Sequence, residues 1–210
     1  MRNLMIAGAL VLAGTIGVHA ADLIVDEAPA VSDTSFVNSS MYVQLLGGAV
    51  QNLAVDYYNG GVDDGHADTE FGYAIAGTVG IVVMDGLSIE GDVLHTSRDA
   101  ADFDNNYYST TSVMANLKYT VDLNDTFSVY GAVGVGYVWG TEYFAGDTTD
   151  YNGFGAQVIA GVSAKLTDNI SGVAEYRYQT TFDKSNFDGP ADFGLIIPTG
   201  TVLAGLKLSF

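Results

Sequence analysis

Two side chains suited to ester hydrolysis, those of His95 and Ser97, stand two residues apart in this sequence. That spacing places both on the same face of an extended strand, and an imidazole beside a hydroxyl is the pair that nucleophilic hydrolysis requires. Such a pair also needs a third residue that orients the imidazole, and no carboxylate is clearly placed to orient His95. We therefore predict that the protein is not an enzyme and has no catalytic residue, with a lipid-modifying hydrolase as the alternative.

A second group of reactive side chains lies in the segment DDGHAD at 63–68, whose acidic residues and histidine could hold a metal ion. The segment lacks the glycine and acidic spacing of a calcium-binding loop. The sequence contains no cysteine, which excludes a disulfide framework and a thiolate zinc site. We therefore expect neither a metal nor a cofactor. The formal net charge of -18 excludes nucleic acid as a partner, because its phosphates would be repelled.

A third set of side chains carries charge at alternate positions of extended segments. Both signs fall on one face, although the chain has only 7 Lys and Arg against 25 Asp and Glu. This concentration is expected where a narrow interior must pair its charges. The expected interior network comprises Glu90, Asp92, Lys118, Lys165, Glu175, Arg177 and Lys207.

Two pairings are expected within this network. Glu90 and Lys118 are predicted to lie opposite each other, across neighbouring strands in which the numbers of paired residues add to about 208. A second cluster is predicted to combine Glu175, Arg177 and Lys207.

The elements that must position these residues are strands, because apolar and polar residues alternate with a period of two over eight segments. The segments are 41–50, 70–83, 87–96, 111–121, 126–139, 153–166, 170–180 and 200–210. Short connections at 84–86, 122–125 and 167–169 contain the Asp, Asn and Gly of tight turns. Long polar and aromatic connections at 51–69, 97–110, 140–152 and 181–199 alternate with the short ones, so we expect all the long loops at one end of the sheet.

One face of each strand is apolar. It would point inward in a soluble sandwich or lipocalin-like barrel, and outward in a transmembrane barrel. We favour the transmembrane barrel, because aromatic residues gather at both ends of the apolar band, as interfacial girdles do. The predicted fold class is therefore all-β: an eight-stranded antiparallel up-and-down transmembrane β-barrel with short periplasmic turns and long extracellular loops. The predicted girdle residues are Phe71, Tyr73, Tyr119, Phe127, Tyr137, Trp139, Phe154, Tyr178 and Phe210.

The N-terminal residues 1–20 are predicted to be a signal peptide. Arg2 is followed by an apolar run that is shorter than the about 20 residues of a membrane-spanning helix. Small residues then fit cleavage after Ala20, with Ala21 as the other candidate. The acidic, aperiodic residues 21–40 are expected to form a periplasmic leader, and residues 41–210 the barrel domain.

The last segment, VLAGLKLSF at 202–210, ends on Phe210 with its apolar residues on one face. Together with the signal peptide and the acidic leader ADLIVDEAPAV, this ending resembles the small eight-stranded outer-membrane β-barrel family of opacity-type and outer-membrane-protein-A-type barrels. It is similar in particular to alphaproteobacterial porin-like surface antigens. The resemblance implies a place in the outer membrane of a Gram-negative bacterium, in contact with lipid and lipopolysaccharide. It also implies that the barrel assembly machinery recognises Leu206, Leu208 and Phe210.

Eight strands enclose an interior that side chains can fill, so we expect a largely plugged polar lumen. Function then falls to the long loops, and we expect a role in envelope integrity and surface interaction, with a host or surface ligand left open. The alternative is a small porin for water or small solutes. We interpret the loop acids as solvated surface charge in preference to divalent-cation bridges to lipopolysaccharide. These acids are Asp56, Asp63, Asp64, Asp68, Asp99, Asp102, Asp104, Glu142, Asp147, Asp150, Asp183, Asp188 and Asp192.

Overall fold

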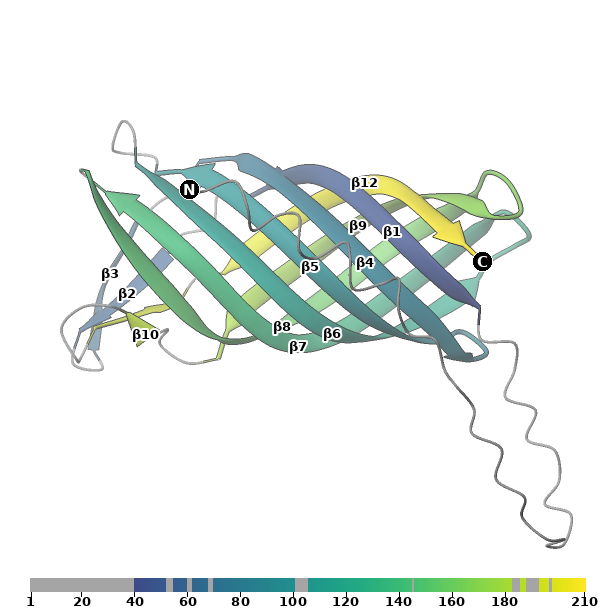
Figure 1. Cartoon of the computed structure of the whole chain (residues 1–210), viewed down its shortest axis with the longest axis horizontal. Helices are drawn as coiled ribbons and strands as arrows, with labels where there is room; N and C mark the ends of the chain where they lie inside the picture. The colour runs from purple at the N-terminus through teal and green to yellow at the C-terminus, as the bar shows by residue number, and fades with distance from the viewer. Residues whose placement is uncertain are drawn as a thin grey trace, which may run out of the picture. The chain divides into compact units, whose positions relative to one another are not determined.

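Eight strands form a closed barrel in the computed structural model (Figure 1). The structure describes residues 40–51, 55–59, 62–67, 70–100, 106–144, 146–182, 186–187, 193–196 and 198–210. The predicted signal peptide and all but the last residue of the predicted leader therefore lie outside the described residues. The barrel strands are β1 Met41–Val50, β4 Gly72–Met84, β5 Leu87–Asp99, β6 Tyr107–Asp122, β7 Phe127–Phe144, β8 Asp147–Lys165, β9 Ile170–Thr181 and β12 Thr199–Ser209.

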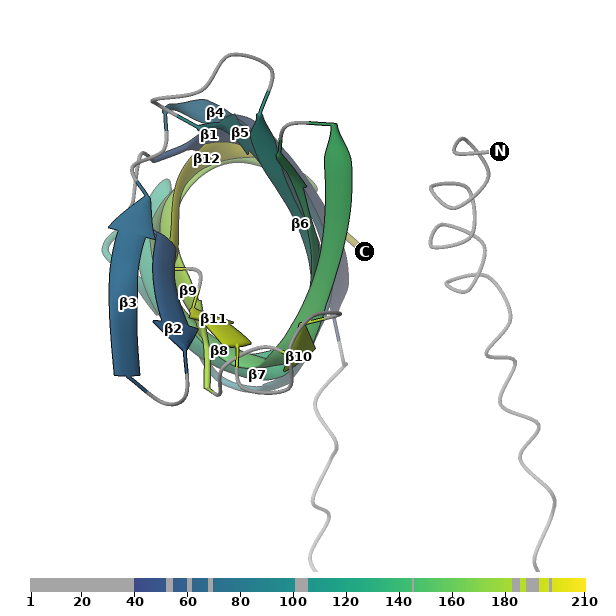
Figure 2. The same cartoon turned by 90° about the vertical axis from the view of Figure 1, so that its left-hand side faces the viewer.

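Each barrel strand pairs antiparallel with the strands that precede and follow it in the barrel. The ring closes because β12 pairs with β9 on one side and with β1 on the other (Figure 2). All backbone hydrogen-bonding edges of the eight strands are thereby paired, which a structure in lipid requires. The predicted all-β, eight-stranded, antiparallel up-and-down fold is confirmed.

The strands β5 to β8 are longer than the sequence predicts. β5 continues to Asp99, β6 begins at Tyr107, and β7 and β8 run through the predicted loop 140–152 as a continuous ladder. The turn of this hairpin includes Gly146, whose φ of 97° favours glycine. The prediction was wrong here because it relied on an apolar outward face, whereas the outward residues of the extension, such as Thr141 and Asp150, are polar.

Two other predicted loops also contain strands. β2 Val55–Asn59, β3 Val62–Ala67 and β11 Phe193–Ile196 form a separate three-stranded antiparallel sheet. β10 Asn186–Phe187 pairs with β8. The first and last long connections can supply strands to one sheet because they adjoin β1 and β12, which are neighbours in the closed barrel.

The three short connections lie together at one end of the barrel, here called the turn end, and the opposite end is called the loop end. Gly86 adopts a φ of 71° in the first turn. In the second turn, the Asn124 side-chain oxygen accepts hydrogen bonds from the backbone N–H groups of Thr126 and Phe127, each at 2.9 Å. Gly86 and Asn124 thus act in these two turns as their residue types predict.

The two faces of the barrel wall differ in polarity as expected for a transmembrane barrel. Outward side chains are apolar and exposed, such as Leu45 at 68% and Val133 at 59%, whereas the inward Arg177 is only 1% exposed. The soluble alternative requires the reverse arrangement and is therefore excluded. Among the described residues, no helix is long and apolar enough to cross a membrane.

Candidate functional site: the charged barrel interior

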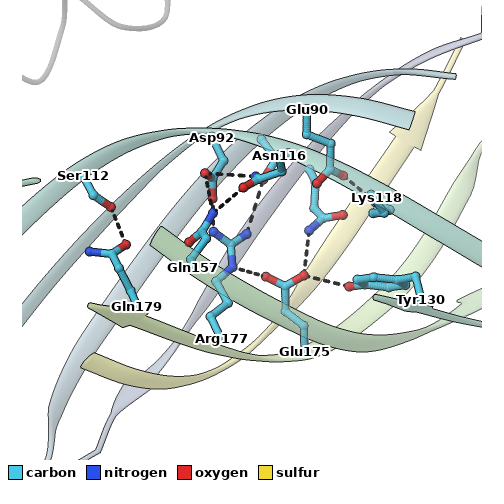
Figure 3. Close-up of polar contacts among 12 residues, drawn as sticks. Glu90, Asp92, Ser112, Asn116, Lys118, Tyr130, Gln157, Glu175, Arg177 and Gln179 are labelled. Carbon is cyan, nitrogen blue, oxygen red and sulfur yellow. Dashed lines mark hydrogen bonds and ion pairs between the residues drawn. The ribbon is translucent and has the colours of Figure 1, made fainter. Parts of the chain in front are cut away.

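Arg177 lies among the polar side chains of the interior (Figure 3) and bonds side chains of β4, β5 and its own strand, β9. Its Nε donates to Glu175 on the same strand, and its Nη1 donates to Asp92 on β5. Its Nη2 donates to the Thr78 hydroxyl on β4 at 3.4 Å. Glu175 and Arg177 share a face because they are two residues apart on β9. A buried guanidinium is thus held between two buried carboxylates.

The remaining carboxylate oxygens of this group accept hydrogen bonds from neutral side chains. Glu175 Oε2 accepts from the Tyr130 hydroxyl at 2.7 Å and from Gln44 at 3.3 Å. Asp92 Oδ1 accepts from Asn116 at 3.2 Å and Gln157 at 3.0 Å. Buried carboxylates are stable only when their lone pairs are satisfied in this way.

Lys118 forms a second charged group toward the turn end. Its Nζ lies 2.5 Å from Glu90 Oε1, which also accepts a 2.6 Å hydrogen bond from the Tyr42 hydroxyl. The same ammonium lies 4.6 Å from the ring centroids of both Tyr42 and Tyr130. Because Tyr130 also bonds Glu175, the two charged groups form one continuous network.

The register of this pair differs from the predicted one. Ser88 lies opposite Lys118, and Glu90 lies opposite Asn116. Glu90 and Lys118 are therefore diagonal neighbours on the inner face, two residues out of the predicted alignment. They still pair because long side chains reach diagonal positions on adjacent strands.

Glycines opposite the two tyrosines make room for this arrangement. Tyr42 pairs with Gly80 across β1 and β4, and Tyr130 pairs with Gly161 across β7 and β8. A Cβ atom at either glycine would clash with the tyrosine ring that lies over it. The two rings therefore lie over these glycines, and their hydroxyls bond the carboxylates of the network.

Two predicted members of the interior network lie at the turn end, away from Arg177: Lys165 is outside the interior, and Lys207 is at its edge, over the Tyr42 ring. Lys165 is half exposed at the turn end, where its Nζ lies 3.1 Å from Asp168. Alternation places Lys165 on the inward-facing side of β8, but it is the last residue of that strand and extends past the interior. The Nζ of Lys207 lies 5.7 Å from the centroid of the Tyr42 ring. Along β12, Lys207 is six residues from Thr201, which pairs with Arg177 of β9. The predicted cluster of Lys207 with Glu175 and Arg177 is therefore wrong, because six residues span about 20 Å along a strand.

Several interior residues were not predicted as site residues. The neutral hydrogen-bond partners occupy inward-facing positions, as their charged neighbours do. The alternation of inward and outward residues along each strand could have identified them. Arg98 was assigned to a loop, yet it is 3% exposed on the extended end of β5. It donates to the backbone carbonyls of Gln51 and Pro198, each at 3.3 Å. The neutral partners are Tyr42, Gln44, Thr78, Asn116, Tyr130 and Gln157.

The predicted girdle residues all lie on the outer face. Toward the loop end, the Tyr137 ring packs edge-on against Trp139 at 4.9 Å and Phe154 at 5.1 Å. Its hydroxyl donates to Asn152 Oδ1 at 2.5 Å. All but the half-buried Tyr137 are exposed: Phe71, Tyr73, Trp139, Phe154 and Tyr178 toward the loop end, and Tyr119, Phe127 and Phe210 toward the turn end.

The C-terminal residues predicted to guide assembly also face outward. Leu206, Leu208 and Phe210 are exposed, and the Phe210 backbone N–H donates to the Met41 carbonyl at 2.9 Å. The last residue thus extends the β12–β1 ladder that closes the barrel.

In the described part of the chain, His95 bonds a neutral side chain and no metal-binding group is formed. His95 Nδ1 lies 2.9 Å from the Thr111 hydroxyl, so its hydrogen-bond partner is not a carboxylate. Among the described residues, no group of three or more His, Cys, Asp or Glu side chains could hold a metal ion. Of the segment DDGHAD, residues 63–67 belong to β3 and Asp68 lies outside the described residues.

Comparisons with known proteins agree with this architecture. A family model described as outer membrane protein beta-barrel domain matches residues 9–210. Neisserial surface protein A has a similar structure, with a TM-score of 0.58 and 20% identity over 81% of this chain and 97% of that chain. OprG from Pseudomonas aeruginosa gives a TM-score of 0.60 and 13% identity over 82% of this chain and 96% of that chain. No curated protein matches the sequence.

Proposed function

Since the chain belongs to the family of outer membrane protein β-barrel domains, we propose that it is a non-conducting barrel that supports envelope integrity and presents acidic loops at the cell surface. It is an integral protein of the cell outer membrane, with the short turns on the periplasmic side. The observation that carries the proposal is the buried network around Arg177, which occupies the lumen where a solute would have to pass.

The network supports a closed lumen because its members come from seven of the eight barrel strands. Side-chain hydrogen bonds link residues of β1, β4, β5, β6, β7, β8 and β9. Opening a path would separate buried opposite charges, and leaving one such charge unpaired costs about 3–5 kcal/mol.

The residues at the loop end support a role in surface interaction rather than in catalysis. Described acidic residues there, including Glu70, Asp99, Asp147 and Asp150, are exposed. Exposed charge of one sign keeps loops solvated and repels other acidic surfaces. The bond between His95 and a threonine hydroxyl supports the view that the protein is not a hydrolase.

Conductance in planar lipid bilayers tests the closed lumen directly. The purified, refolded full chain is expected to give no steady single-channel current at moderate voltage, while a known porin in the same bilayer serves as the positive control. Insertion is verified by the heat-modifiable gel mobility that folded barrels show. A steady current from the inserted protein would contradict the proposal and favour the small-porin alternative.

A further inference from the structure

The wall formed by β6, β7 and β8 extends beyond the lipid-facing band at the loop end. From Phe127 to Trp139, the outward residues of β7 are apolar or glycine. Twelve residue steps of about 3.3 Å, on a strand tilted by about 45°, cover about 28 Å along the membrane normal. This distance fills the about 25 Å apolar band, so residues 140–144 and their partners on β6 and β8 lie at the level of the outer-leaflet headgroups.

The outer face of this extension carries aromatic rings surrounded by small polar groups. Tyr107 and Tyr143 lie directly opposite each other, and their rings stack with centroids 5.4 Å apart and planes at 16°. Both are partly exposed. The surrounding outward residues supply hydroxyl, amide and carboxylate groups: Ser109, Thr111, Thr141, Thr148, Asp150 and Asn152. Together with the two tyrosines they are called the outer-wall patch.

The charge of the outer-wall patch restricts its ligand. None of the residues named for it is Lys or Arg, and Asp150 is exposed on it. An anionic headgroup phosphate would be repelled there. A neutral, hydroxyl-rich ligand suits the patch, because tyrosine rings offer apolar contact area and the polar neighbours offer hydrogen bonds to hydroxyl groups.

We propose that the outer-wall patch binds neutral sugars of the glycolipid in the outer leaflet around the barrel. The C–H faces of the sugar rings pack on Tyr107 and Tyr143, while sugar hydroxyls bond the carboxylate and amide groups nearby. The patch lies on one side of the barrel, because β1 and β12 have 10 and 11 residues whereas β7 and β8 have 18 and 19. The proposal depends on the outer-membrane orientation but not on a closed lumen.

The chain's one tryptophan provides a probe next to the patch. Trp139 lies opposite Thr111 on one side and Asn152 on the other. The full-length barrel in phospholipid nanodiscs is titrated with phosphate-free core oligosaccharide, prepared from lipopolysaccharide, while Trp139 emission is recorded. A saturable change is expected. The double variant Tyr107→Thr, Tyr143→Thr, which keeps strand propensity, is expected to bind about ten-fold more weakly.

Three controls test whether the aromatic faces of the outer-wall patch bind the sugar. The double variant Tyr107→Phe, Tyr143→Phe keeps the aromatic faces and is expected to bind nearly as the natural chain does. Tyr119→Thr, which changes an exposed outward tyrosine at the turn end, is expected to leave affinity unchanged. Binding is also expected to persist in a chelator of divalent cations.

The proposal is overturned if the natural chain shows no saturable change, if the threonine double variant binds equally well, or if chelation abolishes binding. Bilayer conductance is a separate measurement whose result does not depend on sugar binding. Failure of the sugar-binding proposal is therefore distinguishable from failure of the closed-lumen proposal.

Discussion

Arg177 and Arg98 are both buried inside the barrel, but their partners differ. Arg177 lies between two carboxylates at the middle of the wall. Arg98 lies six residues beyond Asp92 on β5, about 20 Å further toward the loop end, and donates to main-chain carbonyls. A charge deep in a membrane barrel needs opposite charge because water is scarce there, whereas a charge at the mouth can use neutral acceptors near solvent.

The two arginines also differ in what they connect. Arg177 extends from β9 and bonds side chains of β4 and β5, so that its bonds run across the interior of the barrel. Arg98 bonds Gln51, which directly follows β1, and Pro198, which directly precedes β12. These are the points where the first and last long connections leave the barrel. In the proposed closed barrel the middle network would block the lumen, whereas Arg98 ties the residue after β1 to the residue before β12.

Removal of the central guanidinium is expected to have the largest effect. Arg177→Met leaves Asp92 and Glu175 buried without a counter-charge and should lower the free energy of unfolding by about 3–5 kcal/mol. Urea titration of the barrel in lipid vesicles, followed by heat-modifiable mobility, measures this change. Adding Asp92→Asn and Glu175→Gln to the same chain should restore most of the loss. Equal stability of the single variant and the natural chain would show that the carboxylates are not held by Arg177.

Filling a glycine opposite a network tyrosine should have a smaller effect. Gly161→Ala places a Cβ against the Tyr130 ring, and overpacking of this kind costs about 1–3 kcal/mol. The displaced ring should also weaken its bond to Glu175. The matched control is Gly77→Ala, because a Cβ at Gly77 meets no atom within 4 Å. The same urea titration should separate the two variants, and identical midpoints would contradict a role for packing at Gly161.

The mouth arginine should matter less for stability than for the loops. Arg98→Met removes two hydrogen bonds whose carbonyl acceptors can bond water instead, so the expected cost is about 1 kcal/mol. Limited proteolysis of the folded barrel should then cut faster in segments 52–71 and 183–197, while the barrel itself stays resistant. An unfolding loss as large as that of Arg177→Met would remove the distinction between the two arginines.

The sequence was sufficient to predict which side chains of each strand face inward and which face outward. It was not sufficient to predict the pairing register between strands or the residues at which strands end. The outward positions of Val133 and Leu206 follow from alternation, which lipid imposes directly. The two-residue shift between Glu90 and Lys118 could not be read from alternation, because moving a strand by two residues keeps every side chain on its face. Arg98 was missed because the outward positions of the extension meet water or headgroups, where no apolar signal marks a strand.

The smallest effect on stability is expected from substitution of Lys165, which alternation places on the inward side of β8 but which lies outside the interior. Lys165 and Asp168 form an exposed pair at the turn end, with half of the lysine side chain accessible. Such surface pairs contribute about 0–1 kcal/mol, so Lys165→Met should leave the unfolding midpoint almost unchanged. Lys118→Met, the matched substitution inside the network, should be clearly destabilising because it leaves the buried Glu90 without its counter-charge. If both variants lost the same stability, depth within the barrel would not determine the strength of its ion pairs, and the difference between the middle and the ends of the lumen would have to come from packing.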